Sequence, residues 1–197
     1  MSITRRTATA GLASLALLRP AAAQGFPAKQ IRIVVPYPGG GPTDALARII
    51  EQELRETKGW NVIVENKAGA SGAIGTREVA KAEPDGHAIV LGNNQTHATN
   101  AFLIKEPGYD PIADFAPLAG LADLQHVLVA RKSLGVTTVA ELIAIAKKDP
   151  GKLNYGSTGT GSGSHLAMEL LKTITGAQMA HIPFKGAAPM AIEIVAG

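Results

Sequence analysis

The chain has 197 residues, no cysteine, 4% aromatic residues and a formal net charge of +3 at pH 7. The lack of cysteine excludes a disulfide framework, so stability must come from burial of Ala, Val, Ile and Leu. The charges are scattered, without the basic block or stripe that nucleic-acid binding requires, which excludes nucleic acid as a partner.

The first 23 residues have the pattern of a secretory signal peptide. Arg5 and Arg6 form a short basic region, an apolar run covers residues 8–18, and three alanines at 21–23 precede Gln24. The run is too short to span a bilayer, although a membrane anchor or an N-terminal helix is the alternative. We expect export to the periplasm by the Sec or the twin-arginine route. Without this leader the chain carries 16 basic and 16 acidic residues.

Strand-like and helix-like segments alternate in the first half of the remaining chain. β-Branched runs predict strands, and apolar residues at helical spacing predict a long helix from about Thr43 to Lys58, closed by Gly59. A short helix through 79–80 and a polar loop at 92–96 are also expected. The predicted strands cover 31–36, 62–64 and 88–91.

The alternation resumes after a Pro-, Gly- and Asp-rich connection at 106–115. A threonine cap and an acidic first turn, formed by Thr137, Thr138 and Glu141, predict a helix ending at Lys148. The other expected elements are extended segments at 117–122 and 126–130, strands at 153–155 and 181–184, and helices from 166 to about 176 and at 187–196.

Strands that alternate with helices through short loops predict an α/β fold with parallel sheets covered by helices. We place a first lobe at 24–124 and a second, partial lobe at 125–197. The second lobe has few strands for a stable sheet, and the chain stops directly after an apolar helix. We therefore expect the sequence to be cut short.

Two Gly-rich turns between a strand and a helix are candidate ligand loops. The first contains Tyr37, Gly39, Gly40, Gly41, Thr43 and Asp44. Glycines allow backbone N–H groups to approach a ligand, and the N-terminus of the following helix favours an anion. The alternative is a simple turn whose Thr43 caps the helix.

The second turn is the richest Gly/Ser/Thr stretch of the chain and lies at 156–165. Its alternative is a flexible linker, which is rare inside a tight strand–helix unit. Its candidate ligand residues are Ser157, Thr158, Gly159, Gly161, Ser162 and His165. A third turn, at 66–75, adds Ser71, while Gly75 fits close packing of the helix on the sheet at least as well as ligand contact.

The motifs of several enzyme classes are absent from the sequence. A nucleophile elbow needs glycine two residues before and two residues after the serine, but Thr160 precedes Ser162 and Ala73 follows Ser71 at these positions. No phosphate-binding loop is present either. The five histidines form no i, i+4 pair for a metal, so neither a metal nor a cofactor is expected. A binding protein rather than an enzyme is predicted. The alternative from another class is an exported serine hydrolase or transferase that uses Ser162 or Ser71 with His165.

Several stretches in order along the chain resemble the tripartite tricarboxylate transporter receptors, the Bug or TctC family of solute-binding proteins. They are IVVPYPGGGPTD at 33–44, VENKAGA at 64–70, PDGH at 84–87, YGSTG at 155–159 and HIPFKG at 181–186. Two departures stand out: Phe184 replaces the tyrosine common in the family, and family members continue beyond residue 197.

The resemblance implies a monomeric receptor with the two-lobed, type II periplasmic-binding-protein-like fold. It implies capture of a small carboxylate, such as a di- or tricarboxylate, an acidic amino acid or an aromatic acid, and delivery to membrane permease subunits. Its loops correspond to the two candidate ligand loops given above. A truncated receptor fragment without function is the remaining alternative.

Overall fold

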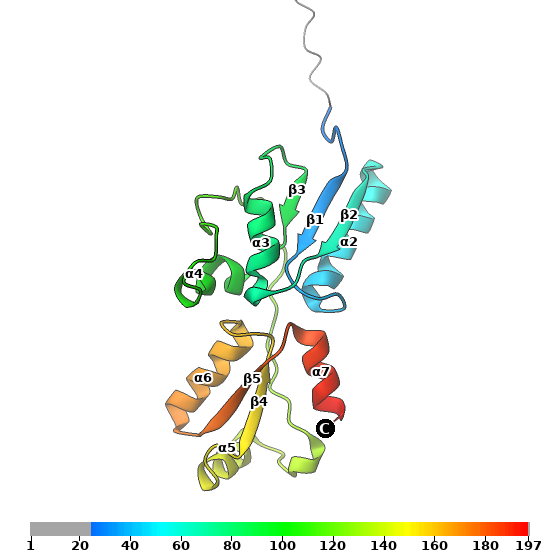
Figure 1. The fold of residues 1–197 in the computed structure, drawn as a ribbon. Helices are drawn as coiled ribbons and strands as arrows, with labels where there is room; N and C mark the ends of the chain where they lie inside the picture. The colour runs from blue at the N-terminus through cyan, green and yellow to red at the C-terminus, as the bar shows by residue number, and fades with distance from the viewer. Residues whose placement is uncertain (1–24, 197) are drawn as a thin grey trace, which may run out of the picture.

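The computed structural model describes residues 25–196, so the predicted signal peptide lies outside the described residues. Helices and strands form two groups, each built around a parallel sheet, and Figure 1 shows one group above the other. The first group contains β1 (Ile31–Val35), α2 (Pro42–Lys58), β2 (Val62–Asn66), α3 (Ala73–Ala80), β3 (Ala88–Val90) and α4 (Asn100–Leu103). The second contains α5 (Val139–Lys148), β4 (Leu153–Ser157), α6 (Gly163–Thr175), β5 (Met179–Pro183) and α7 (Ala187–Ala196).

The first sheet has the strand order β2-β1-β3, with β1 in the centre. Ile33 pairs with Val64 on one side and with Ile89 on the other. A central parallel strand is covered on both faces, which explains why β1 is apolar and buried at every position except Arg32. The buried core of this lobe consists of Ile31, Ile33 and Val35 of β1 together with Ala47, Val62 and Leu91.

The second sheet contains the two parallel strands β4 and β5, with Tyr155 paired to His181. Its core consists of Ala146, Tyr155, Met168, Ala177 and Met179. The described residues therefore form a mixed α/β fold with two parallel sheets flanked by helices, as predicted. The boundary between residues 124 and 125 stays a prediction.

The helix ends follow local sequence rules. Gly59 ends α2 in the left-handed conformation, with φ of 67°, and its N–H donates to Arg55 O. α5 begins with a capping box in which Thr138 accepts from the Glu141 N–H and Glu141 accepts from the Thr138 N–H.

Two sequence predictions are wrong or displaced, and one of the alternatives is wrong. The segments 117–122 and 126–130 belong to neither sheet and are exposed. The predicted polar loop at 92–96 contains the start of a π-helical turn, η2 (Gln95–Thr99), which continues into α4. α2 begins at Pro42, and its N-cap is Gly41 without a side-chain cap, so Thr43 is not the cap.

Two shorter 3-10 turns complete the described chain: η1 (Ala70–Gly72) and η3 (Lys132–Leu134). None of the helices between residues 25 and 196 is long and apolar enough to cross a membrane.

Candidate functional site

A cavity of about 170 Å³ lies between the two sheets. The segments that directly follow β1, β2, β4 and β5 line it, which is the edge where parallel α/β sheets bind ligands. Four predicted site residues, Tyr37, Ser71, Thr158 and Gly159, are in its wall. The other lining residues are Pro36, Pro38, Ala68, Gly69, Ala70, Gly72, Thr160, Pro183, Phe184 and Lys185.

The remaining predicted residues lie near the cavity without lining it: Gly39, Gly40, Gly41, Thr43, Asp44, Ser157, Gly161, Ser162 and His165. Sequence reasoning did not select Pro36, Ala68, Phe184 or Lys185 as site residues. Three of these have no polar side-chain group, so only their position directly after a strand could have identified them. Lys185 is the one charged side chain in the described lining, which makes the cavity suited to an anion.

The N-terminus of α2 is already occupied by its own carboxylate. Asp44 is 4% exposed, and its Oδ2 accepts the Gly40 N–H at 2.9 Å. Arg48 Nε and Asn66 Nδ2 also donate to this carboxylate, at 3.0 and 3.0 Å. The Arg48 bonds, followed by those from Gly40 and Asn66, lower the pKa of Asp44 to about 2. Asp44 therefore orders the first Gly-rich turn as a permanent anion.

The second Gly-rich turn also satisfies most of its own N–H groups. The N–H of Thr158 donates to Ser164 Oγ at 3.1 Å, and that of Gly159 donates to Ser157 Oγ at 3.2 Å. The Gly161 N–H donates to His165 Nδ1 at 3.1 Å. Ser162 caps α6 by accepting the His165 N–H at 3.2 Å. These donors are thus engaged within the turn in this structure, and the turn is ordered rather than a flexible linker.

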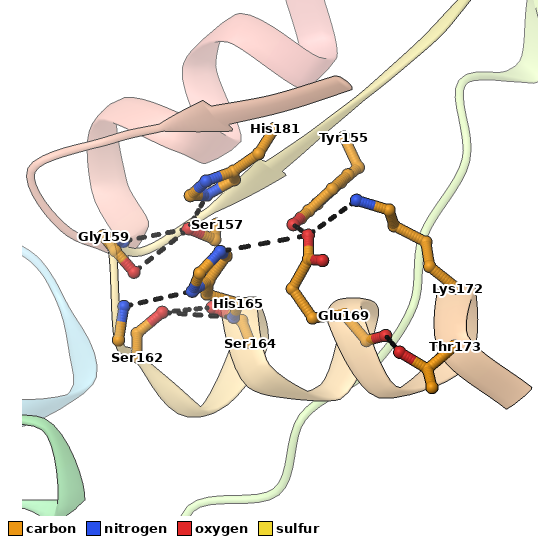
Figure 2. Close-up of polar contacts among 11 residues, drawn as sticks. Tyr155, Ser157, Gly159, Ser162, Ser164, His165, Glu169, Lys172, Thr173 and His181 are labelled. Carbon is orange, nitrogen blue, oxygen red and sulfur yellow. Dashed lines mark hydrogen bonds and ion pairs between the residues drawn. The ribbon is translucent and has the colours of Figure 1, made fainter. Parts of the chain in front are cut away.

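Figure 2 shows the side chains of β4, β5 and α6 that contact this turn or one another. The rings of His165 and His181 stack at 4.1 Å between centroids, and the rings of Tyr155 and His181 stack at 4.9 Å. The Tyr155 hydroxyl and Lys172 Nζ both donate to Glu169. His181 Nε2 lies 2.7 Å from Ser157 Oγ. Burial, followed by the charge of His165, lowers the pKa of His181, so its ring is neutral at pH 7.

This Ser157–His181 contact was not predicted, and it resembles a nucleophile–base pair only in its distance. Ser157 is 0% exposed, and its Oγ also contacts the Gly159 backbone. Ser162 bonds to Ser164 Oγ and to the His165 N–H, and not to an imidazole nitrogen. Ser71 Oγ donates to Thr160 O at 3.1 Å. Within residues 25–196, no set of three His, Asp or Glu side chains could hold a metal ion.

The two lobes are joined directly across the cavity. Gln95 Nε2 donates to Thr160 O at 2.7 Å, and Thr99 Oγ1 donates to Gly161 O at 2.7 Å. Gln95 Oε1 and Asn93 Oδ1 each lie 2.9 Å from the Tyr37 hydroxyl. Burial raises the pKa of Tyr37 to about 12, so this hydroxyl keeps its proton.

The sequence model of the family described as "Tripartite tricarboxylate transporter family receptor" matches residues 46–197. The chain belongs to this family. Two curated relatives align with the full length of the chain. They are a "UPF0065 protein in tcbD-tcbE intergenic region" of Pseudomonas sp. (strain P51), 37% identical, and "Protein BugT" of Bordetella pertussis, 34% identical. The chain spans 59% and 61% of the lengths of these relatives.

Solved structures of this family have the same fold. "R. palustris Rpa4515 with adipate" is 39% identical with a TM-score of 0.78, over 87% of this chain and 57% of that one. "MatC (Rpa3494) from Rhodopseudomonas palustris with bound malate" is 34% identical with a TM-score of 0.80, over 87% and 58% of the two chains. The fold of the chain is therefore that of the periplasmic binding proteins of the TctC/Bug type, as predicted.

Proposed function

We propose that the chain is part of an extracytoplasmic receptor that captures a small carboxylate for a tripartite tricarboxylate transporter. The observation that carries this proposal is the cavity between the lobes, whose walls are the turns after four parallel strands. Lys185 gives it a positive charge, and no acidic side chain is among its described lining residues. The adipate and malate bound by two relatives of similar fold support the same ligand class.

Recognition in this proposal relies mainly on the backbone and on Lys185. Ala70 and Ser71 both have positive φ, of 46° and 54°, in the turn that lines the cavity. Strained backbone of this kind is often found where a ligand is held. An anion reaching the cavity would meet this turn on one side and the Lys185 side chain on the other. The periplasmic location, the permease partner and the monomeric state are parts of the same proposal.

Thermal unfolding with a panel of carboxylates tests the function. Adipate and malate bind the native state only, so each should raise the melting temperature as its concentration increases. Adipamide is the control because it has the length of adipate without its charges. If no acid of the panel changes the melting temperature of the folded chain, the proposal is wrong.

A substitution at Lys185 tests the site. Lys185→Gln should weaken binding of adipate about tenfold, as expected for the loss of a charged hydrogen bond at an exposed position. Lys152→Gln is the matched control because Lys152 is exposed at the start of β4, outside the cavity lining. Equal affinities of the two variants would remove Lys185 from the site.

A further inference from the structure

Two glycines of the Gly-rich turn at 156–165 lie against side chains of the other lobe. A Cβ added to Gly159 would lie 3.1 Å from Gln95 Nε2, and one added to Gly161 would lie 3.0 Å from Thr99 Oγ1. Both glycines also have positive φ, of 135° and 82°. Glycine is therefore required at 159 and 161 partly because the η2 turn lies against them.

In the described residues, the hydrogen bonds between the lobes have all their donors on the first lobe and all their acceptors on the second. Side chains of the first lobe are the donors, and the Thr160 and Gly161 carbonyl oxygens of the second lobe are the acceptors. The donors belong to Ser71 in η1 and to Gln95 and Thr99 in η2. Two adjacent carbonyl groups thus receive three hydrogen bonds, which is a specific contact between the two turns.

Gln95 has a central position in this contact. It is 1% exposed, although a glutamine side chain is usually solvated. A carbonyl oxygen can only accept, so the amide nitrogen of Gln95 must face Thr160 O, and Oε1 must face the Tyr37 hydroxyl. The amide therefore connects one wall of the cavity, at Tyr37, to the opposite wall, at Thr160.

The orientation of Gln95 fixes the polarity of the cavity hydroxyls. Tyr37 has one proton, and its two partners, Gln95 Oε1 and Asn93 Oδ1, are both acceptors. The Ser71 hydroxyl proton is likewise directed to Thr160 O. Both hydroxyls then present only lone pairs to the cavity, which repel a carboxylate. In this structure, the hydroxyl protons of Tyr37 and Ser71 are therefore directed to protein acceptors and not into the cavity.

We propose that the η2 turn is a latch that holds the two lobes closed over the cavity, with Gln95 as its positioning residue. The Gly159–Gly161 stretch is the segment of the second lobe that this latch contacts. The inference rests on the proposed function in one respect, that closure of the lobes encloses the ligand. The distance between the lobes can be measured without ligand, so failure of the latch is distinguishable from failure of carboxylate binding.

The experiment measures the distance between the lobes in the ligand-free chain. Because the sequence has no cysteine, exposed residues of α2 and α6 can be labelled through Glu56→Cys and Thr173→Cys with spin labels. Gln95→Glu replaces the donor to Thr160 O by an oxygen that repels it. The population ratio of open to closed lobes should rise about tenfold or more, as expected when a buried hydrogen bond is replaced by an unpaired acceptor.

Lowering the pH should reverse this effect in the variant alone. Once protonated, the introduced Glu can again donate to Thr160 O, so the closed distance should return at about pH 4 to 5. The titratable groups beside it are Tyr37, which keeps its proton, and His97, whose pKa is lowered by burial. The unsubstituted chain, measured at both pH values, controls for the titration of His97.

Gln178→Glu is the matched control, since Gln178 is exposed between α6 and β5. It should leave the distance distribution unchanged. If Gln95→Glu does not fold, Thr99→Val removes the second donor with little change of shape and should raise the open population about fivefold. A folded Gln95→Glu or Thr99→Val chain with the distances of the unsubstituted protein would overturn the latch.

Discussion

Asp44 and Arg48 lie one turn apart on α2 and are joined by two hydrogen bonds, Nε–Oδ2 of 3.0 Å and Nη2–Oδ1 of 3.1 Å. The same carboxylate accepts the Gly40 N–H, so the pair connects the helix to the Gly-rich turn before it. Asp44→Asn removes the charge and leaves these donors with a weaker acceptor. It should lower the free energy of unfolding by about 1–3 kcal/mol, measured by urea denaturation.

The pH dependence of stability reports the same carboxylate. Its pKa of about 2 in the folded chain is below the ordinary value of 3.8, so its stabilisation is present above pH 3.8 and is lost as the pH falls towards 2. The loss is at most about 2.5 kcal/mol. The free energy of unfolding of Asp44→Asn should depend less steeply on pH in this range. The control Asp123→Asn, at an exposed position, should leave the pH dependence of stability unchanged.

Gly75 is a packing position of α3 rather than a ligand contact. A Cβ added there would lie 2.9 Å from Lys67 O and 3.1 Å from Pro36 Cα, both of them backbone atoms. Gly75→Ala should therefore destabilise the fold by about 1–3 kcal/mol in urea denaturation. Gly120→Ala is the control because an added Cβ there meets no atom within 4 Å. Similar stability of the two variants would contradict this packing.

Ala70 has a left-handed backbone with φ of 46°, which costs an L-residue energy that glycine does not incur. Ala70→Gly is thus expected to raise the free energy of unfolding by about 0.5–1 kcal/mol, contrary to most glycine substitutions. Ala45→Gly, on the exposed face of α2, should lower it by about the same amount. A loss of stability in Ala70→Gly would show that the turn is not strained.

Burial lowers the pKa of His181, whose ring stacks with those of Tyr155 and His165. The unfolded chain then binds the proton more readily, so the stabilisation is complete above pH 6.5 and declines as the pH falls below it. His181→Phe keeps a stacked ring without titration and should flatten thermal stability between pH 7 and 5. His126→Phe, at an exposed position, should retain the slope of the unsubstituted chain.

The elements that local patterns define were predictable from the sequence. β1 is apolar at every position except Arg32, and Gly59 and the Thr138–Glu141 pair mark helix ends by chemistry that needs no distant partner. The segments at 117–122 and 126–130 have similar apolar content, but a strand requires a neighbour in a sheet. In the described chain neither has one, and their sequence contains no sign of this.

The site was predictable in its position but not in its hydrogen bonds. The Gly-rich turns after parallel strands indicated Tyr37, Ser71, Thr158 and Gly159, which line the cavity. Gln95 was missed because an amide in a polar loop is usually solvated, and its burial depends on residues more than 60 positions away in the chain. Whether the predicted residues bind a ligand stays a prediction.

The stretch from Ile104 to Thr138, without strands, is the one backbone connection between the two lobes in the described part of the chain (Figure 1). This connection limits how far the two lobes can separate. Their mutual orientation then depends on an intramolecular association, whose strength is set by the effective concentration that the tether imposes. Lengthening or stiffening this connection should therefore tune how often the lobes meet without altering any residue of the cavity.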